Sequence, residues 1–362
     1  MEEHTGFVLH GGVLYSQDKD TLVSLPDAYV VCVDGVSQGV FEELPEEFEN
    51  LPMEDCWDKV IVPGFVNLGV HAPGYQIRGL STELDDETWR DGVLLPEEEN
   101  YSDPTYAARA YDIFVENLFV GATTRAVVSG TRHMDATVKL MDFLEEAGLV
   151  TFVGPSLADQ GLAGEFLVPA KSMMEDLEKW LESAGEKYER TYPVLIPREP
   201  RLCTEELGQI LLDLNVGYGA MSSLLIESYH GLKSDLALTR EKMDQGLPVG
   251  LRRGSGRCGD ISIFSAMRDA MNVSKLQAAE SQDGMEPFSF EEVFYMATLG
   301  GGTYFGEVGS FEEGYEFDAV VIDDSNQDTL YEFEPRERIE RLLDCADDRN
   351  VVGKYVQGNK LY

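Results

Sequence analysis

The chain has 362 residues, of which 43% are hydrophobic and 10% aromatic, so it can bury a sizeable core and is not a disordered chain. Its 28 basic and 67 acidic residues give a formal net charge of −39, which repels phosphate backbones and anionic lipids and argues against nucleic-acid and membrane roles. No apolar run of 18 residues and no signal-peptide pattern occur, and the five widely spaced cysteines indicate free thiols. These features predict a cytoplasmic protein whose acidity is either a solvated surface, as in salt-adapted proteins, or a docking face for a basic partner.

The first 62 residues favour β-structure. Three runs rich in β-branched and aromatic residues, at 7–15, 28–34 and 59–71, are separated by Gly, Asp and Pro. Between the last two runs, the acidic segment 41–56 contains two prolines and is expected to form a loop.

From about residue 100 the pattern alternates between helices and strands. Apolar residues at helical spacing predict helices around 106–118 and 140–147. Short apolar runs predict strands at 123–130, 149–155 and 191–197.

Capping residues mark three further helices. Ser172 with Glu175 predicts a capping box for a helix through Trp180, and Thr204 predicts the start of a helix that ends near Leu214. A second capping box is predicted at Ser289 and Glu292, for a helix that stops at the glycines of TLGGG.

Later segments complete the pattern. Strands are predicted at 214–221 (LNVGYGAM) and 247–252 (LPVGLR), with a short helix at 236–243 between them. The tail returns to β character in FDAVVID and KYVQGNKLY. Alternating strands and helices imply a parallel sheet with both faces covered, so we predict an α/β fold: a TIM-barrel-like barrel over 63–307, and a small β-sandwich built from both termini, 1–62 plus 308–362.

Five segments in the same order resemble the guanine deaminase family of the amidohydrolase superfamily. They are VPGFVNLGVHAPGYQIRGL, DPTYAARAYDIFVENLFVGATTRAVVSGTRH, PREPRLCTEEL, FEEVFYMATLGGGTYFGEVGSFEEGYEFDAVVID and DDRNVVGKYVQGNKLY. The resemblance implies a metal-dependent barrel with a β-sandwich, and hydrolysis of guanine to xanthine with one zinc ion. Such a metal lowers the pKa of bound water, and a nearby Glu moves protons to the purine.

The residues at the family's ligand positions depart from this pattern. The His-x-His positions hold Gly69 and His71, Gly219 stands where the fifth strand supplies a histidine, and Gly254 stands at the position of the metal Asp. Ser222 lies near the position of the catalytic Glu. The resemblance therefore implies a lost metal site, with His71 as a vestigial ligand position, no catalytic residues and no expected cofactor.

The chain is also short where the family has its later strands. Arg198 should end the fourth strand and Gly254 the eighth, which leaves 254 − 198 = 56 residues. Four strand–helix units would need roughly 120 residues, so we predict an incomplete barrel that is shortened between 199 and 253 by about two units. An exposed strand edge would follow, beside Leu214, Val216, Val249 and Leu251, and it predicts a homo-oligomer or a complex with another protein subunit.

Two residues remain at family positions that contact the base, Trp89 and Arg198, as a remnant of the substrate pocket. An Arg at a strand end is equally well explained by a structural ion pair. A relocated metal site from His230, Cys258 and Asp260 matches no known ligand spacing.

Three functional interpretations follow. The first is a guanine-deaminase-like protein without catalysis, which acts as a binding, regulatory or structural subunit. The alternative is an active guanine or purine deaminase, a hydrolase of cyclic amidines, with a rebuilt zinc site. A weaker one is a small-molecule sensor that keeps the purine pocket around Arg198 and Trp89. The residues leave the enzyme question open and favour the first interpretation.

Overall fold

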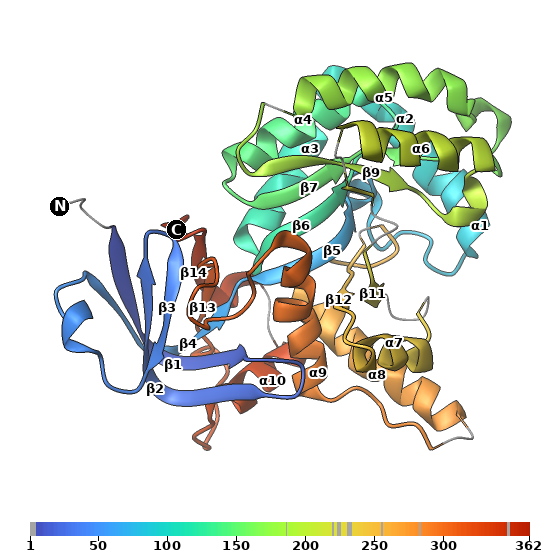
Figure 1. Cartoon of the computed structure of the whole chain (residues 1–362). Coiled ribbons are helices and arrows are strands. Elements are labelled where there is room, and N and C mark those ends of the chain that lie inside the picture. Colours follow the sequence, from blue (N-terminus) through green and yellow to red (C-terminus); the bar gives the residue numbers. More distant parts are fainter. Residues whose placement is uncertain are drawn as a thin grey trace.

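The computed structural model describes residues 5–362, apart from 186, 219–220, 223–225, 230–233, 255, 282–283 and 346–347. A β-region made from both ends of the chain lies beside a larger α/β region (Figure 1). No helix within the described ranges is long and apolar enough to span a bilayer. The predicted fold class, an incomplete TIM-barrel-like barrel with a small β-sandwich from both termini, is confirmed as a barrel-like α/β fold with a β-sheet region, and that region is one sheet of seven strands.

The β-region is one mixed sheet of seven strands, in the order β15-β14-β13-β4-β1-β2-β3. Its strands are β1 (Gly6–Ser16), β2 (Leu22–Val33), β3 (Val36–Phe41), β4 (Met53–Pro63), β13 (Ala319–Ile322), β14 (Val351–Val356) and β15 (Asn359–Lys360). β4 runs parallel to β1 and antiparallel to β13, so the N-terminal and C-terminal thirds of the chain are joined in one ladder. Helix α10 (Pro335–Cys345) packs against this sheet.

The α/β region contains parallel strands, several of which are buried along nearly their whole length. They are β5 (Phe65–His71), β6 (Thr123–Ser129), β7 (Val150–Gly154), β8 (Ser156–Leu157), β9 (Thr191–Pro197) and β10 (Met221–Ser222), followed by the separate pair β11 (Ser228–Tyr229) and β12 (Gly250–Leu251). The main sheet runs β10-β9-β7-β6-β5. Continuous apolar runs form such strands because helices or other strands cover both faces.

Helices cover the outside of these strands. They are α1 (Asp86–Trp89), α2 (Leu95–Glu99), α3 (Pro104–Val120), α4 (Met134–Glu146), α5 (Ala170–Ala184), α6 (Glu205–Tyr218), α7 (Leu236–Asp244), α8 (Ile263–Glu280) and α9 (Phe290–Tyr295). In Figure 1, α3 to α6 lie over β6, β7 and β9, whereas α7 and α8 lie beside β11 and β12. The largest core cluster fills the space between α3–α6 and the main sheet.

The strands trace a ring that is smaller than eight strands. β10 pairs with β9 and β11 pairs with β12, yet only five residues separate β10 from β11 in the sequence. Two successive parallel strands need a crossover of a dozen or more residues, so β10 and β11 are two parts of one ring position. The positions are therefore β5, β6, β7, β9, the β10/β11 segment and β12, six in all within the described ranges.

Asn67 joins the last ring position to the first. Its side-chain nitrogen donates to the Arg253 carbonyl at 3.1 Å, and its side-chain oxygen accepts from the Arg253 backbone N–H at 3.0 Å. Among the described residues β12 and β5 form no backbone ladder, and the hydrogen bonds of the Asn67 side chain join them instead. The ring is therefore held closed at this point by one buried side chain.

One predicted strand is a helix in the structure. Residues 214–218 belong to α6 instead of a strand, because Leu207, Leu211 and Leu214 form a buried helical stripe that outweighs the β propensity of Val216. Val216 is 84% exposed on this helix, so it does not lie at an open strand edge.

Of the three predicted helix starts, one is wrong and two are right. α5 begins at Ala170 after Pro169, which places Ser172 inside the helix and not at its start. Thr204 accepts from the Leu207 backbone N–H at 3.2 Å, and Ser289 with Glu292 forms the predicted capping box.

Candidate functional site

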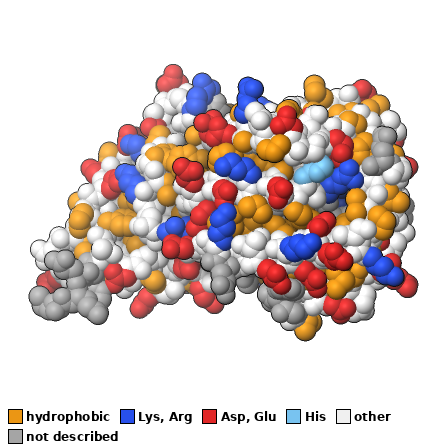
Figure 2. Space-filling model, turned by 90° about the horizontal axis from the view of Figure 1, so that it is seen from above, with side chains coloured by type: hydrophobic (Ala, Val, Ile, Leu, Met, Phe, Trp, Pro, Cys, Tyr) orange, Lys and Arg blue, Asp and Glu red, His pale blue; other side chains and the backbone are white. Residues whose placement is uncertain are grey.

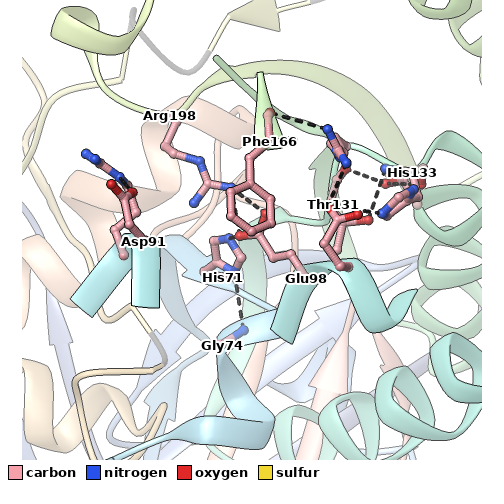
Figure 3. A network of polar contacts seen from close by, with 12 residues as sticks. His71, Gly74, Asp91, Glu98, Thr131, His133, Phe166 and Arg198 are labelled. Atoms are coloured by element: carbon pink, nitrogen blue, oxygen red, sulfur yellow. Dashed lines mark hydrogen bonds and ion pairs between the residues drawn. The ribbon is translucent and has the colours of Figure 1, made fainter. Parts of the chain in front are cut away.

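The candidate site lies at the carboxyl ends of β5, β6 and β9. His71 is the last residue of β5, Ser129 is the last residue of β6, and Arg198 follows β9 directly. Parallel strands end at one common edge, which brings residues together that are more than 100 positions apart. Helix α2 adds Glu98 to this edge (Figure 3).

Glu98 is the centre of a buried network of charged and polar side chains. Its two carboxylate oxygens accept from Nη2 of Arg198 at 2.7 and 2.6 Å. Oε1 also lies 2.9 Å from Nε2 of His71, at an angle that makes this a close polar contact more than a well-aligned hydrogen bond. The Glu98 and Arg198 side chains are 3% and 9% exposed, so the pair is shielded from water.

The carboxyl group of Glu98 stays ionised at neutral pH. Burial alone would raise its pKa, but the positive charge of Arg198 and the contact with His71 outweigh burial and lower the pKa to about 2. A carboxylate with so low a pKa is a poor proton acceptor near neutral pH. Its role is to hold Arg198 and His71 in place.

The contacts of His71 define which ring nitrogen carries the proton. Nδ1 accepts from the Gly74 backbone N–H at 3.3 Å, so the neutral ring carries its proton on Nε2, which faces Glu98. A metal ligand needs a nitrogen with a free lone pair. In this arrangement both ring nitrogens of His71 are already engaged.

A cavity of about 220 Å³ lies above this network. Its polar lining consists of Glu98, Glu99, Arg132, His133, Ser156, Asp176 and Arg198. Its apolar lining includes Leu95, Leu157, Leu162, Phe166, Val168 and Met173. Apolar walls with a few convergent polar groups are typical of small-molecule sites.

Phe166 and Arg132 form one wall of this cavity. In Figure 3 the Phe166 ring lies over the Arg198–Glu98–His71 network. Arg132 holds it there through a hydrogen bond to the Phe166 carbonyl at 3.3 Å and an ion pair with Glu99 at 2.7 Å. A wider groove of about 730 Å³ along α3, α4 and α5 shares four lining residues with the cavity, namely Arg132, His133, Met134 and Asp176.

The two residues predicted to remain from the substrate pocket lie in different parts of the structure. Arg198 lines the cavity, and its Nε and Nη1 groups make no hydrogen bond to the part of the chain that the structure describes. Trp89 is buried outside the cavity, where its Nε1 donates to the Leu80 carbonyl at 2.9 Å and its ring packs against Gly256. Of this predicted pair, only Arg198 lies in the candidate site.

The predicted ligand positions do not assemble a metal site among the described residues. Gly69 has no space for a side chain, because a Cβ there would lie 2.7 Å from Cδ and 2.8 Å from Cγ of Arg252. Gly254 carries no ligand, and Gly219 lies outside the described ranges. Within those ranges no group of three or more His, Cys, Asp or Glu side chains could hold a metal ion.

The alternative ligand set is not assembled either. Asp260 is paired with Arg253 at 3.1 Å. His230 lies outside the described ranges, and Cys258 is partly exposed. A zinc ion therefore does not fit the described residues at the family positions or at this alternative set.

Sequence reasoning missed two residues of the site and one residue beside Gly69. Glu98 stands in the acidic run PEEEN, which reads as a solvated surface, and only its contacts reveal a buried carboxylate. Phe166 lies between predicted elements and carried no signal. Arg252 next to the Gly254 position was visible as a charge at a strand end, which is the one signal that could have been used.

Comparison with known proteins agrees with these features. The Amidohydrolase family model matches residues 220–361. A guanine deaminase of Dictyostelium discoideum is 23% identical over 97% of both chains. The structure of a guanine deaminase from C. acetobutylicum with bound guanine in the active site matches with a TM-score of 0.90 and 26% identity, over 99% of this chain and 100% of that one.

The alignment length also measures what this chain lacks. The Dictyostelium alignment is 439 positions long, so at least 439 − 362 = 77 positions have no residue in this chain. Two strand–helix units of a barrel amount to about 62 residues. The missing residues are therefore enough for two strand–helix units, which is the difference between this ring of six positions and a complete barrel of eight.

The expectation that this chain has no cofactor is contradicted by the comparisons. Guanine deaminases and related amidohydrolases are typically zinc-dependent. An adenosine deaminase from Xanthomonas campestris, solved with bound zinc, shares the fold with a TM-score of 0.72 and 17% identity, over 98% of this chain and 92% of that one. These findings together show that the chain is similar to guanine deaminases over nearly its whole length, and that residues 220–361 match the Amidohydrolase family model.

Proposed function

We propose that the chain binds a guanine-like purine base in the Arg198 cavity and hydrolyses its amino group. In this reaction water adds to the ring carbon that carries the amino group, ammonia leaves, and an oxo group remains. The observation that carries the proposal is the guanidinium of Arg198. Glu98 engages one of its nitrogens, while the remaining N–H groups are left to a ligand in an apolar cavity.

The cavity has the chemistry that a flat heterocycle needs. The free N–H groups of Arg198 can donate to a carbonyl oxygen or a ring nitrogen, and the Glu98 carboxylate keeps the guanidinium in one orientation. The Phe166 ring offers an aromatic face for stacking. The polar groups that line the cavity sit on α2, α5 and β8 and on the segments that follow β6 and β9, so the site is largely formed before a ligand binds.

Zinc in the relatives supplies the activated water for hydrolysis. The described residues of this chain do not fit such an ion at the family positions, so a rebuilt metal site would need ligands outside the described ranges. Arg198, Glu98 and Phe166 act on the base alone: they bind it, orient it and keep water from its ring face.

The test is formation of xanthine from guanine, quantified by mass spectrometry with protein purified without chelator and supplied with zinc. We expect turnover that scales with protein, and a decrease of at least tenfold in kcat/KM for Arg198→Gln. Arg201→Gln is the matched control, because Arg201 follows the same strand but is half exposed and paired with Glu199. Xanthine formation that is equal in wild type and Arg198→Gln would refute the assignment.

A second candidate is a protein that binds the base without converting it. The observation in its favour is the side chain of Arg252, which fills the space beside Gly69 where the relatives' first ligand would project. Guanine that raises Tm without forming xanthine would select this candidate. In that case a homo-oligomer or another subunit would be the functional unit, as the sequence predicts.

A further inference from the structure

Arg252 occupies the centre of the barrel mouth. It follows β12, and its side chain runs past Gly69 into a cavity of about 50 Å³ at the carboxyl ends of the strands. The cavity is also lined by Val70, Ser129, Pro197 and Ser228, so it is enclosed by β5, β6, β9 and β11. It shares no lining residue with the Arg198 cavity.

The positive charge of Arg252 has no counter-ion in the part of the chain that the structure describes. No carboxylate oxygen lies within 4.0 Å of its guanidinium there, and its side chain donates no hydrogen bond to a described residue. By contrast, the adjacent Arg253 is paired with both Asp260 and Asp269.

The chain has 67 acidic and 28 basic residues, yet Arg252, like the exposed Arg109, has no carboxylate partner among the described residues. Arg252 is exposed to solvent at the mouth of the cavity, but desolvation by the surrounding protein still lowers its pKa, and the charge of Glu199 opposes this effect. The side chain still remains charged at neutral pH. Its charge is therefore available to a ligand that can enter the cavity.

We propose that this cavity is a binding site for a small planar oxyanion, with Arg252 as the counter-ion. One water molecule needs about 10–15 Å³ of such space, so 50 Å³ accommodates a group of the size of a carboxylate. The planar guanidinium matches a carboxylate in shape and donates two parallel hydrogen bonds to it. The oxyanion is either a free small carboxylate or the ionised edge of a larger ring compound.

Gly69 positions Arg252 for this role. Any side chain at position 69 would collide with Cγ and Cδ of Arg252 and push the guanidinium away from the strand ends. The glycine at this position is thus explained by the arginine beside it. A single methyl group at position 69 should displace the charge without removing it.

The experiment is isothermal titration calorimetry at constant ionic strength, with formate as the free anion and urate, which is anionic at neutral pH, as the ring compound. We expect at least one of them to bind the wild type, and Arg252→Gln to weaken that binding roughly tenfold to hundredfold, the range of a charged hydrogen bond. Gly69→Ala should weaken it in the same direction. The matched control is Arg109→Gln, which removes the same charge from an exposed position on α3.

The outcomes separate this site from the proposed function. Arg198→Gln should abolish guanine binding and leave formate binding intact, whereas Arg252→Gln should do the reverse. Binding of formate would show a free anion site, and binding of urate alone would assign the anion to a ring. No binding of either anion by the wild type, or equal affinity in wild type and a folded Arg252→Gln, would overturn the proposal.

Discussion

Both carboxylate oxygens of Glu98 lie within 2.7 Å of one nitrogen of Arg198, and 100 residues of sequence separate the two side chains. The pair connects helix α2 to the end of β9 in the interior of the protein. It therefore fixes the floor of the Arg198 cavity and contributes to the stability of the fold.

Replacement of Glu98 by Gln should destabilise the protein by about 3–5 kcal/mol, because it leaves the Arg198 charge buried without compensation. The measurement is the free energy of unfolding in urea. Glu99→Gln serves as the control, because the Glu99 side chain is 37% exposed and its pair with Arg132 should contribute less than about 1 kcal/mol. Equal effects of the two substitutions would contradict the role of the buried pair.

The lowered pKa of Glu98 predicts that the free energy of unfolding decreases in acid. The pKa of Glu98 is lowered from 4.5 in the unfolded chain to about 2 in the folded protein, so its contribution is complete above pH 4.5 and is lost as the pH falls towards 2. The shift corresponds to about 3 kcal/mol. Unfolding measured from pH 6 to pH 2 should show a smaller acid-induced loss in Glu98→Gln than in wild type, and parallel curves would exclude this contribution.

Arg125 and Asp318 form a second buried pair, which connects the barrel strand β6 to the β-region. Nε and Nη2 of Arg125 donate to Asp318 at 2.7 and 2.9 Å, and both side chains are at most 1% exposed. Asp318→Asn should lower the free energy of unfolding by about 3–5 kcal/mol. Glu316→Gln removes the 44% exposed partner of the same arginine and should change it by less than about 1 kcal/mol, so a larger effect of Glu316→Gln would be inconsistent with this account.

The net charge of −39 predicts that salt stabilises the protein. Acidic side chains are spread among basic and apolar ones on the face shown in Figure 2, so the repulsion is general and not confined to one block. Screening lengths fall from about 30 Å at 0.01 M to about 10 Å at 0.1 M ionic strength. Tm should therefore rise with added salt, and a flat or falling dependence would refute the prediction.

The barrel could be predicted from the sequence because its strands and helices differ in local pattern. The buried runs at 123–130 and 191–197 and the capping box at Ser289 all depend on neighbours within a few residues. The helix at 214–218 was missed because packing of its buried leucines against the sheet stabilises it. The local residues Val216 and Gly217 do not indicate that packing.

The site was less predictable for the same physical reason. Arg198 was found through its place at a strand end, but its partner Glu98 is 100 residues away in a run that resembles a surface. The glycine at position 69 was recognised as a departure from the family, whereas the side chain that fills its space comes from position 252. Such relationships arise only when distant segments meet in the fold.

The most direct measurement of the central claim is a crystal structure of the protein with guanine. We predict electron density for the base in the Arg198 cavity, with a carbonyl oxygen or ring nitrogen about 2.7–3.2 Å from an Arg198 N–H group and the Phe166 ring against its face. A base bound elsewhere on the protein, with the Arg198 cavity free of it, would contradict the assignment of this cavity as the purine site.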